Sequence, residues 1–321
     1  LKQLFGSRVA VFTLDPKRSQ ARGLNPEGEI RIPYEEITPE DIEINSGYLN
    51  LTEIGIQTIH SLPSRLGTQW LTEFMDATPD LISTWSEQWG EHVQSLNALK
   101  RRLQTIKRLP FLVTDKIESP LKRILEYLQR GTHVIIEFGS FGRSELAYML
   151  VANLLTRRIF EEYFQLAEEA DATGGEGPRR LIIVVEEAHR FLDPSLSSQH
   201  IFGTIAREMR KANVHLLIID QRPSGIDTEV LSQLGTKITY PLNNDQDISA
   251  VMAGETDSRE LRAVLAGLES TQQALIFGDA VPIPVVVKVR EYGSAASYKA
   301  LEQTETNQDD SRPTKTPNLF G

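Results

Sequence analysis

The sequence predicts an α/β fold: an open, mainly parallel β-sheet whose strands are joined by helices, plus a helical insertion. Two observations lead to this prediction. Short apolar runs rich in β-branched residues alternate with helical patterns, as in a sheet with helical crossovers. The first four of these runs are nearly continuous in apolar residues, which is typical of strands buried on both faces. The expected strands are Val9–Leu14, His133–Phe138, Leu181–Val185, Val214–Asp220, Lys237–Tyr240, Ala274–Phe277 and Val285–Val289.

Helical patterns fill most of the chain between these strands. The longest one after the second strand covers Glu145–Leu166, and another covers Gln199–Lys211. Between the first and second strands there is no strand pattern, but helical patterns carry aromatic residues such as Trp70 and Trp85. The end of the chain is polar and poor in large apolar residues, which favours a flexible tail. The expected division is 1–63 and 131–296 for the α/β core, 64–130 for the helical insertion and 297–321 for the tail.

The composition excludes several classes of protein. The chain has 321 residues, 34 Lys+Arg against 44 Asp+Glu, a formal net charge of −10, 40% hydrophobic residues and no Cys. Disulfide frameworks, thiolate metal sites and a Cys nucleophile are therefore excluded, and an ordinary apolar content excludes disorder for most of the chain. No apolar run approaches the about 18 residues of a membrane span, so we expect a cytoplasmic protein without membrane contact. Its acidic balance means that any contact with nucleic acid must be local.

The densest basic run lies in the expected insertion. It consists of Lys100, Arg101 and Arg102, followed by Lys107 and Arg108. A solvated helix face is the usual explanation for such a run, and a contact with nucleic acid or a partner is the alternative. The sequence by itself favours the first interpretation and leaves the second open.

Two carboxylates follow the expected strand Leu181–Val185. Glu186 and Glu187 stand at its carboxyl end, where ligands bind in open α/β sheets. Successive strand residues point to opposite sides, so the two acids cannot do the same job. One can orient the hydrated magnesium of a bound nucleotide while the other polarises the attacking water. The alternative is a solvated acidic turn without a catalytic role.

The next expected strand, Val214–Asp220, also ends in polar residues, namely Asp220, Gln221 and Arg222. A neutral amide beside the paired carboxylates can contact a γ-phosphate or hold the attacking water. The alternative is that Gln221 caps the following turn, with Pro223 ending the strand.

Three basic residues, Arg207, Arg210 and Lys211, end the helix that precedes this strand. Favourable interaction with the helix dipole explains them structurally, and an arginine that reaches phosphate in a neighbouring subunit explains them functionally.

The strings EEAHRF, AREMRK and IDQRPS, at these separations and in this order, resemble the FtsK–HerA superfamily of P-loop ATPases, and most closely its HerA-type members. Further similar strings cover roughly residues 5–292. They include VAVFTLDPKRSQA, SPLKRILEYLQRGTHVIIEFGS, VLSQLGTKITYPLNNDQDISAV and LIFGDAVPIPVVVKVR. A RecA-like P-loop core is the fold that the resemblance implies.

The resemblance also implies a function and a role for each site residue. It implies hydrolysis of ATP with Mg²⁺, coupled to movement along double-stranded DNA in a homo-hexameric ring, with a NurA-like nuclease as partner in DNA-end processing. Glu187 would be the general base, and Glu186 would hold magnesium through water. Gln221 would sense the γ-phosphate, with Arg222 beside it on the nucleotide. Arg210 would act on the nucleotide of the neighbouring subunit.

The sequence departs from the family pattern in three ways. The phosphate loop, GxxxxGK(S/T), occurs nowhere in the 321 residues, and the family's N-terminal β-barrel is also missing. The nearest Gly-rich segment, Gly139–Glu145, follows a strand and opens a helix but lacks the Lys. Glu186 stands where many P-loop ATPases have Asp, a variant that HerA-type sequences tolerate. Because Leu1 is not Met, we expect a fragment that is inactive by itself, with the phosphate loop upstream.

His189 and two alternative functions complete the predictions from the sequence. His189 follows the paired acids without a second ligand at zinc-like spacing, so we expect it to hold Glu187 instead of a metal. A related pumping ATPase of the conjugation or type IV secretion kind is one alternative function. A non-catalytic assembly module, in which the missing loop is natural, is the other.

Overall fold

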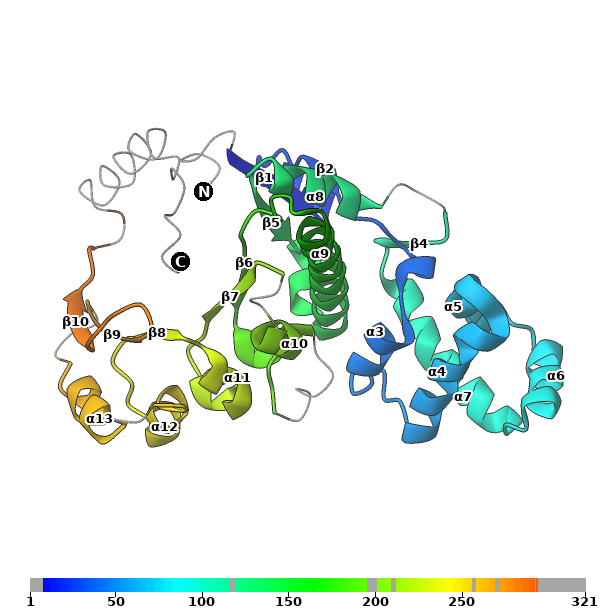
Figure 1. Cartoon of the computed structure of the whole chain (residues 1–321). Helices are drawn as coiled ribbons and strands as arrows, with labels where there is room; N and C mark the ends of the chain where they lie inside the picture. The colour runs from blue at the N-terminus through cyan, green and yellow to red at the C-terminus, as the bar shows by residue number, and fades with distance from the viewer. Residues whose placement is uncertain are drawn as a thin grey trace. The chain divides into compact units, whose positions relative to one another are not determined.

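The computed structural model describes residues 8–115, 119–194, 201–208, 212–255, 258–268, 272–291 and 293. The chain divides into two compact units, Leu1–Gln221 and Arg222–Gly321. All seven expected strands are present, so the α/β prediction is confirmed (Figure 1). The expected tail, 297–321, lies outside the described residues, as does the end of the helix expected over Gln199–Lys211.

The strands of the first unit pair in parallel. Strand β1 is central between β2 and β5, β6 pairs with β7, and β3 pairs with β4. Parallel neighbours that are distant in sequence require crossovers, which helices supply here. The strands are β1 (Val9–Thr13), β2 (Gly28–Glu29), β3 (Ile32–Pro33), β4 (Leu112–Val113), β5 (His133–Glu137), β6 (Leu181–Glu186) and β7 (Val214–Ile219).

Helices make up most of the remainder of this unit. The long helix α9 begins at the N-cap Ser144, whose side chain accepts the backbone N–H of Ala147, and ends at Gly174 in a left-handed conformation. Helices α3, α8 and α10 pack against it. The α-helices are α2 (Pro16–Ala21), α3 (Pro39–Ile44), α4 (Glu53–Leu66), α5 (Trp70–Asp76), α6 (Pro79–Trp89), α7 (Val93–Leu103), α8 (Pro120–Gln129), α9 (Glu145–Thr173) and α10 (Ile201–Glu208).

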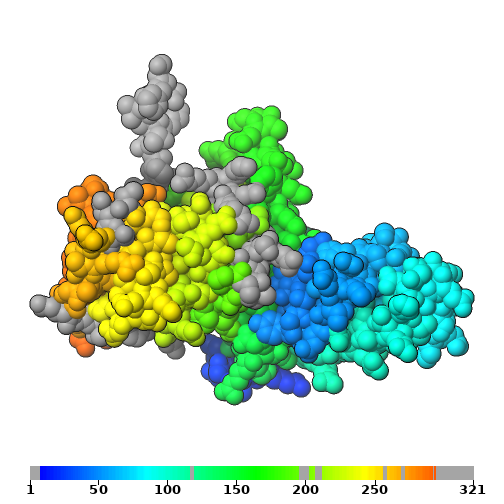
Figure 2. Space-filling view, turned by 90° about the horizontal axis from the view of Figure 1, so that it is seen from below, coloured from blue at the N-terminus to red at the C-terminus, as the bar shows by residue number. Residues whose placement is uncertain are grey.

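Helices α4–α7 form the helical segment of the first unit. Their apolar faces meet around the stacked rings of Phe74, Trp85 and Trp89, and the same apolar core continues to Phe12 of β1 and Leu150 of α9. In Figure 2 this segment (light blue to cyan) is one continuous packed surface. The segment begins at Glu53, earlier than the expected insertion, and shares its core with the strands.

Strands β6 and β7 pack on one face only, so the expectation that they are buried on both faces is wrong. One face packs against Phe160, Tyr163 and Ile205 of α9 and α10. On the other face, four large apolar side chains are exposed within the described structure. They are Ile182, Val184, Leu217 and Ile219.

The second unit is antiparallel, unlike the first. Strand β9 lies between β8 and β10, and its Leu275 and Phe277 pack against Val251 and Leu265 of the helices. The elements are α11 (Thr228–Gln233), β8 (Thr236–Thr239), α12 (Asp245–Val251), α13 (Ser258–Ala266), β9 (Gln273–Gly278) and β10 (Val285–Lys288). Within the described residues, no helix combines the length and apolarity needed to cross a membrane.

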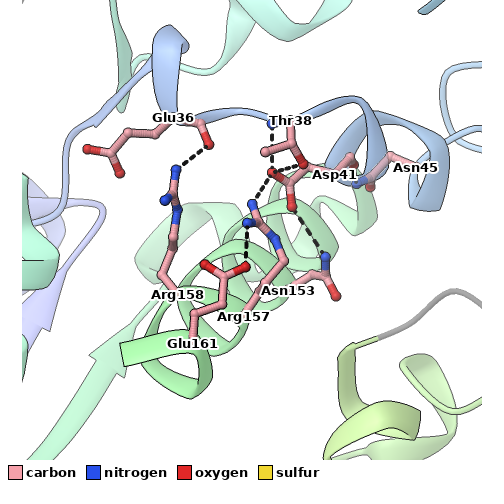
Figure 3. A network of polar contacts seen from close by, with 8 residues as sticks. All are labelled: Glu36, Thr38, Asp41, Asn45, Asn153, Arg157, Arg158 and Glu161. Atoms are coloured by element: carbon pink, nitrogen blue, oxygen red, sulfur yellow. Dashed lines mark hydrogen bonds and ion pairs between the residues drawn. The ribbon is translucent and has the colours of Figure 1, made fainter. Parts of the chain in front are cut away.

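A buried ion pair joins α3 to α9 (Figure 3). Asp41 of α3 is fully buried, and its Oδ2 lies 2.7 Å from Nη2 of Arg157. The same oxygen accepts the backbone N–H of Thr38 at 2.9 Å, and Oδ1 accepts Nδ2 of Asn153 at 3.4 Å. Arg157 also pairs with Glu161, one turn further along α9. These contacts fix where the chain after β3 sits on the long helix.

Candidate active site

The carboxyl ends of β6 and β7 lie side by side. The parallel register aligns Glu186 with Ile219, so Glu187 and Asp220 follow at the same edge of the sheet. The structure therefore brings the two polar strand ends together, as the sequence predicted. Glu186 is exposed, the Glu187 side chain is 50% exposed, and that of Asp220 is only 4% exposed.

Glu187 has an unusual backbone conformation. Its φ of 52° and ψ of 47° place it in the left-handed region, where it precedes the single helical turn η6 (Ala188–Arg190). For a residue with a side chain this conformation costs about 1–2 kcal/mol. Such strain persists only where the surroundings enforce it, and it is frequent at functional sites. The conformation turns the chain abruptly out of β6 and leaves the Glu187 carboxylate half exposed at the sheet edge.

Asp220 and His189 connect the two strand ends. The Oδ2 atom of Asp220 accepts both the backbone N–H and the ring Nδ1–H of His189, each at 2.8 Å. The other ring nitrogen, Nε2, lies 3.9 Å from Oε2 of Glu187. His189 therefore stands between a buried carboxylate and the candidate general base. The sequence analysis gave no role to Asp220, although its position at a strand end was a usable signal.

Arg190 holds the other end of the η6 turn. Its Nε and Nη2 donate to Oε2 of Glu145 at 3.1 and 2.7 Å, and its guanidinium lies 4.0 Å from the ring centre of Tyr148. Burial is the largest influence that raises the pKa of Tyr148, and the nearby charges of Glu186 and Glu187 raise it further, against Arg190. The N-terminus of α9 is thus part of the same polar cluster. No sequence signal singled out Arg190, because its partners lie 45 residues away.

Gln221 and Arg222 are both exposed and stand where the first unit ends and the second begins. Arg222 precedes the short turn η7 (Pro223–Gly225), which has no side-chain cap from that residue. The candidate finger Arg210 and its neighbour Lys211 lie outside the described residues. Arg207 falls within α10.

The Gly-rich segment is occupied by a carboxylate. Its first 5 residues form the turn η5 (Gly139–Arg143), and both the backbone N–H and the hydroxyl of Ser140 donate to Oδ2 of Asp15. These bonds are the main reason why the pKa of Asp15 is lowered. A Cβ on Gly139 would lie 2.4 Å from Cβ of Asp15. Because a carboxylate occupies donors that a phosphate would need, the segment is a structural tie between η5 and α2.

Two residues of the basic run, Lys100 and Lys107, make polar contacts with the end of α5. Lys100 donates to the carbonyl of Ala77, Gln104 donates to that of Met75 at 3.1 Å, and Lys107 pairs with Asp76. Lys100 and Gln104 satisfy carbonyls at the C-terminal end of α5, where a cation such as Lys100 is favourable, and Lys107 pairs with the side chain of Asp76 at the same end. Lys100 and Lys107 are therefore engaged within the protein, which neither the solvated face nor the partner contact predicted.

The donor set at the β6–β7 edge fits a magnesium ion held with a nucleotide. Mg²⁺ in such sites keeps several waters and uses one or two carboxylates besides the phosphates. Glu186 offers an exposed carboxylate for that purpose. Among the described residues, no group of three or more His, Asp or Glu side chains is placed to hold a metal by itself.

Comparisons with known proteins found relatives by sequence. The chain is 25% identical to the DNA double-strand break repair helicase HerA of Pyrococcus furiosus over 83% of this chain and 55% of that protein. It is 36% identical to HerA of Sulfolobus acidocaldarius over 68% of this chain and 44% of that protein, and 36% identical to HerA of Saccharolobus solfataricus over 65% and 41%. The chain thus spans about half the length of the curated relatives it matches.

Two other comparisons concern protein families and solved structures. No protein-family description matches the chain. Among solved structures, the genome packaging NTPase B204 of Sulfolobus turreted icosahedral virus 2, in complex with AMP, is similar with a TM-score of 0.33 and 13% identity, over 52% of this chain and 72% of that one.

Proposed function

The chain belongs to the HerA-type family of P-loop ATPases, and we propose that it is the motor core of a DNA translocase driven by ATP hydrolysis. The observation that carries this proposal is the polar edge of β6 and β7. There a half-exposed carboxylate, an exposed carboxylate and an exposed amide follow the ends of adjacent parallel strands. Catalysis of phosphoryl transfer requires groups that position water, metal and phosphate at one place.

The proposed roles are those that the family resemblance implies, and the positions of the residues support them. Glu187 accepts a proton from the water that attacks the γ-phosphate, a role that suits a carboxylate turned out of the strand. Glu186 would hold magnesium through a water. Bound with the nucleotide, Mg²⁺ supplies positive charge that neutralises the transferring phosphoryl group. Gln221 contacts the γ-phosphate through its amide, and Arg222 contacts the nucleotide beside it.

The remaining parts of the proposal rest on the family resemblance. Arg210 acts on the nucleotide of a neighbouring subunit in a homo-hexamer, and the ring encloses double-stranded DNA. A NurA-like nuclease is the proposed partner in the processing of DNA ends, in the cytoplasm. An acidic chain needs its cations concentrated locally to hold DNA, so binding should weaken steeply with salt.

Nucleotide binding requires hydrogen-bond donors for the phosphates. The sequence of 321 residues contains no phosphate loop that would provide them. A P-loop cradles phosphates with backbone N–H groups and a Lys, and in Gly139–Arg143 the corresponding N–H is bonded to Asp15. We therefore expect the chain by itself to bind ATP weakly or not at all. Calorimetry tests this expectation, and tight magnesium-dependent binding of ATP would contradict it.

The function is tested by ATP hydrolysis in a form of the protein that carries a phosphate loop. Duplex DNA should stimulate hydrolysis, and Glu187→Gln should bind ATP but hydrolyse it about 10²–10⁴-fold more slowly. The matched control is Glu161→Gln, an exposed carboxylate on α9 away from the strand edge. Equal hydrolysis by the parent and Glu187→Gln would reject the proposed role.

A further inference from the structure

The contacts of the η6 turn involve residues that can position the proposed general base, Glu187. In the described part of the structure, the side chain of Glu187 lies near the imidazole ring of His189. The position of this ring is fixed by other contacts. That ring is anchored twice by one oxygen of Asp220, through its backbone N–H and through Nδ1–H. Because Nδ1 is engaged with a carboxylate, Nε2 is the nitrogen turned toward Glu187.

We propose that Asp220 and His189 form a positioning pair that sets the orientation of the Glu187 carboxylate for attack by water. This inference rests on the proposed function of Glu187. Asp220 is the buried member, with 4% of its side chain exposed, and it lies on the neighbouring strand end. It therefore fixes His189 relative to the sheet and not only relative to the turn. His189 spans the gap to Glu187, and the 3.9 Å separation is one that a bridging water or a small side-chain rotation closes.

The left-handed backbone of Glu187 supports the same assignment. A strained residue keeps its conformation only when contacts on both sides enforce it. One side is the β6 strand, which pairs with β7 up to Glu186. On the other side, His189 is bonded to Asp220 and Arg190 is bonded to Glu145. The two anchors differ, since only the histidine side chain reaches back to Glu187.

The charged groups around the histidine are of both signs. Glu187 and Asp220 flank the ring, and Arg190 follows it in the turn, with Glu145 of α9 as its partner. An asparagine at position 189 keeps a donor near the place of Nδ1 but loses the group near Nε2. A glutamine places its amide near Nε2. The two variants therefore separate anchoring of the ring from contact with Glu187.

The test has one readout that does not depend on ATP. In the chain with isotope-labelled histidine, the Nδ1–H signal of His189 should be present, should persist in Glu187→Gln and should be lost in Asp220→Ala. Its presence unchanged in Asp220→Ala would overturn the pairing. His215 of β7 serves as the control, because its substitution by Gln removes a histidine from the same strand pair but not from the turn.

The second readout is catalysis, in a form of the protein that hydrolyses ATP. Asp220→Ala, His189→Ala and His189→Asn should lower kcat about 10–100-fold, the usual cost of losing a supporting partner, with the KM for ATP unchanged. His189→Gln should recover part of the loss. In the Glu187→Gln background, removal of His189 should cause no further loss, since residues that act as a unit are not additive.

The outcomes distinguish the two proposals. If Glu187→Gln hydrolyses ATP at the parent rate, the proposed function of Glu187 fails. If Glu187→Gln is inactive while the His189 and Asp220 variants keep the parent kcat, the positioning pair fails alone. A fall in kcat that matches only a loss of folded protein, measured by circular dichroism, would also overturn the pair, because it would show a purely structural role.

Discussion

Removal of Arg157 should expose the cost of the buried carboxylate that it neutralises. Asp41 has no exposed surface, whereas the Arg157 side chain is 17% exposed and keeps a second partner in Glu161. Arg157→Met leaves Asp41 with hydrogen bonds only from Thr38 and Asn153. Breaking a buried ion pair in this way costs about 3–5 kcal/mol of the free energy of unfolding. Asp41→Asn should cost less, about 1–3 kcal/mol, because the remaining cation still reaches Glu161 and solvent.

The pH dependence of this loss has a defined sign. Burial raises the pKa of Asp41 above its ordinary value of 3.8, and the charge of Arg157 is the first influence that opposes this rise. Without Arg157 the pKa in the folded state rises further. A group whose folded-state pKa is raised contributes stability below its unfolded pKa and loses it as the pH rises. The destabilisation by Arg157→Met should therefore be smallest near pH 4 and grow toward pH 7.

Urea unfolding of the chain, followed by circular dichroism from pH 4 to pH 7, measures both effects. The double variant Asp41→Leu with Arg157→Met removes both charges and should recover most of the loss. Arg158→Met is the matched control. Arg158 donates a 3.4 Å hydrogen bond to the carbonyl of Glu36 and its charge acts on the Glu36 carboxylate, so its loss should cost about 1 kcal/mol. A loss below about 1 kcal/mol for Arg157→Met, the value of an exposed pair, would refute the reasoning.

Three further predictions concern the site and its surroundings. Glu186→Gln should weaken magnesium-dependent nucleotide binding, whereas Glu187→Gln should affect hydrolysis alone; the reverse pattern in a binding and hydrolysis assay would mean that the two roles are exchanged. Arg210→Ala and Glu187→Gln proteins, each inactive, should regain part of the ATPase activity when mixed in one ring, because an arginine that acts in trans is worth about 10³–10⁵ in rate; no recovery in rings proven to be mixed would place Arg210 within its own subunit. Because the pKa of Asp15 is lowered, chiefly by Ser140, its contribution to stability is present above the ordinary value of 3.8 and is lost as the pH falls. Ser140→Ala should return that pKa toward 3.8 in an NMR titration, and an unchanged value would show that Ser140 is not the cause.

The sequence predicted those features that depend on local pattern and on the rules of parallel sheets. Apolar runs predicted the strands, and the rule that parallel strands end at one edge predicted that Glu187 and Gln221 lie at the same edge. The contacts that shape this edge could not be predicted, because they join residues 31 and 45 positions apart through individual side-chain directions. The left-handed Glu187 is likewise invisible in sequence, since nothing in glutamate favours that conformation.

The contacts of the basic run could not be predicted from its charge pattern. Its charge density suggested a surface for a partner or a solvated face, but Lys100 and Lys107 are tied to the end of α5. A charge pattern does not reveal that a neighbouring helix ends beside it with unsatisfied carbonyls. The pairing of Asp41 with Arg157 could not be predicted for the same reason, because the two residues are separated by 116 positions.

Helix α9 contacts both the candidate site and helix α3. Its first turns hold Arg190 through Glu145 and Tyr148, and Arg157 further along holds α3. Tyr148 and Arg157 are nine residues apart on one continuous helix, which is about 13–14 Å along its axis. Both contacts are polar and partly buried, so each fixes an orientation and not only a distance. Energetic coupling between the two ends of α9 would require an element with two alternative arrangements. The contacts on α9 describe a single arrangement. The helix therefore holds both the η6 turn and α3, and the turn that follows Glu187 is fixed by the sheet on one side and by α9 on the other.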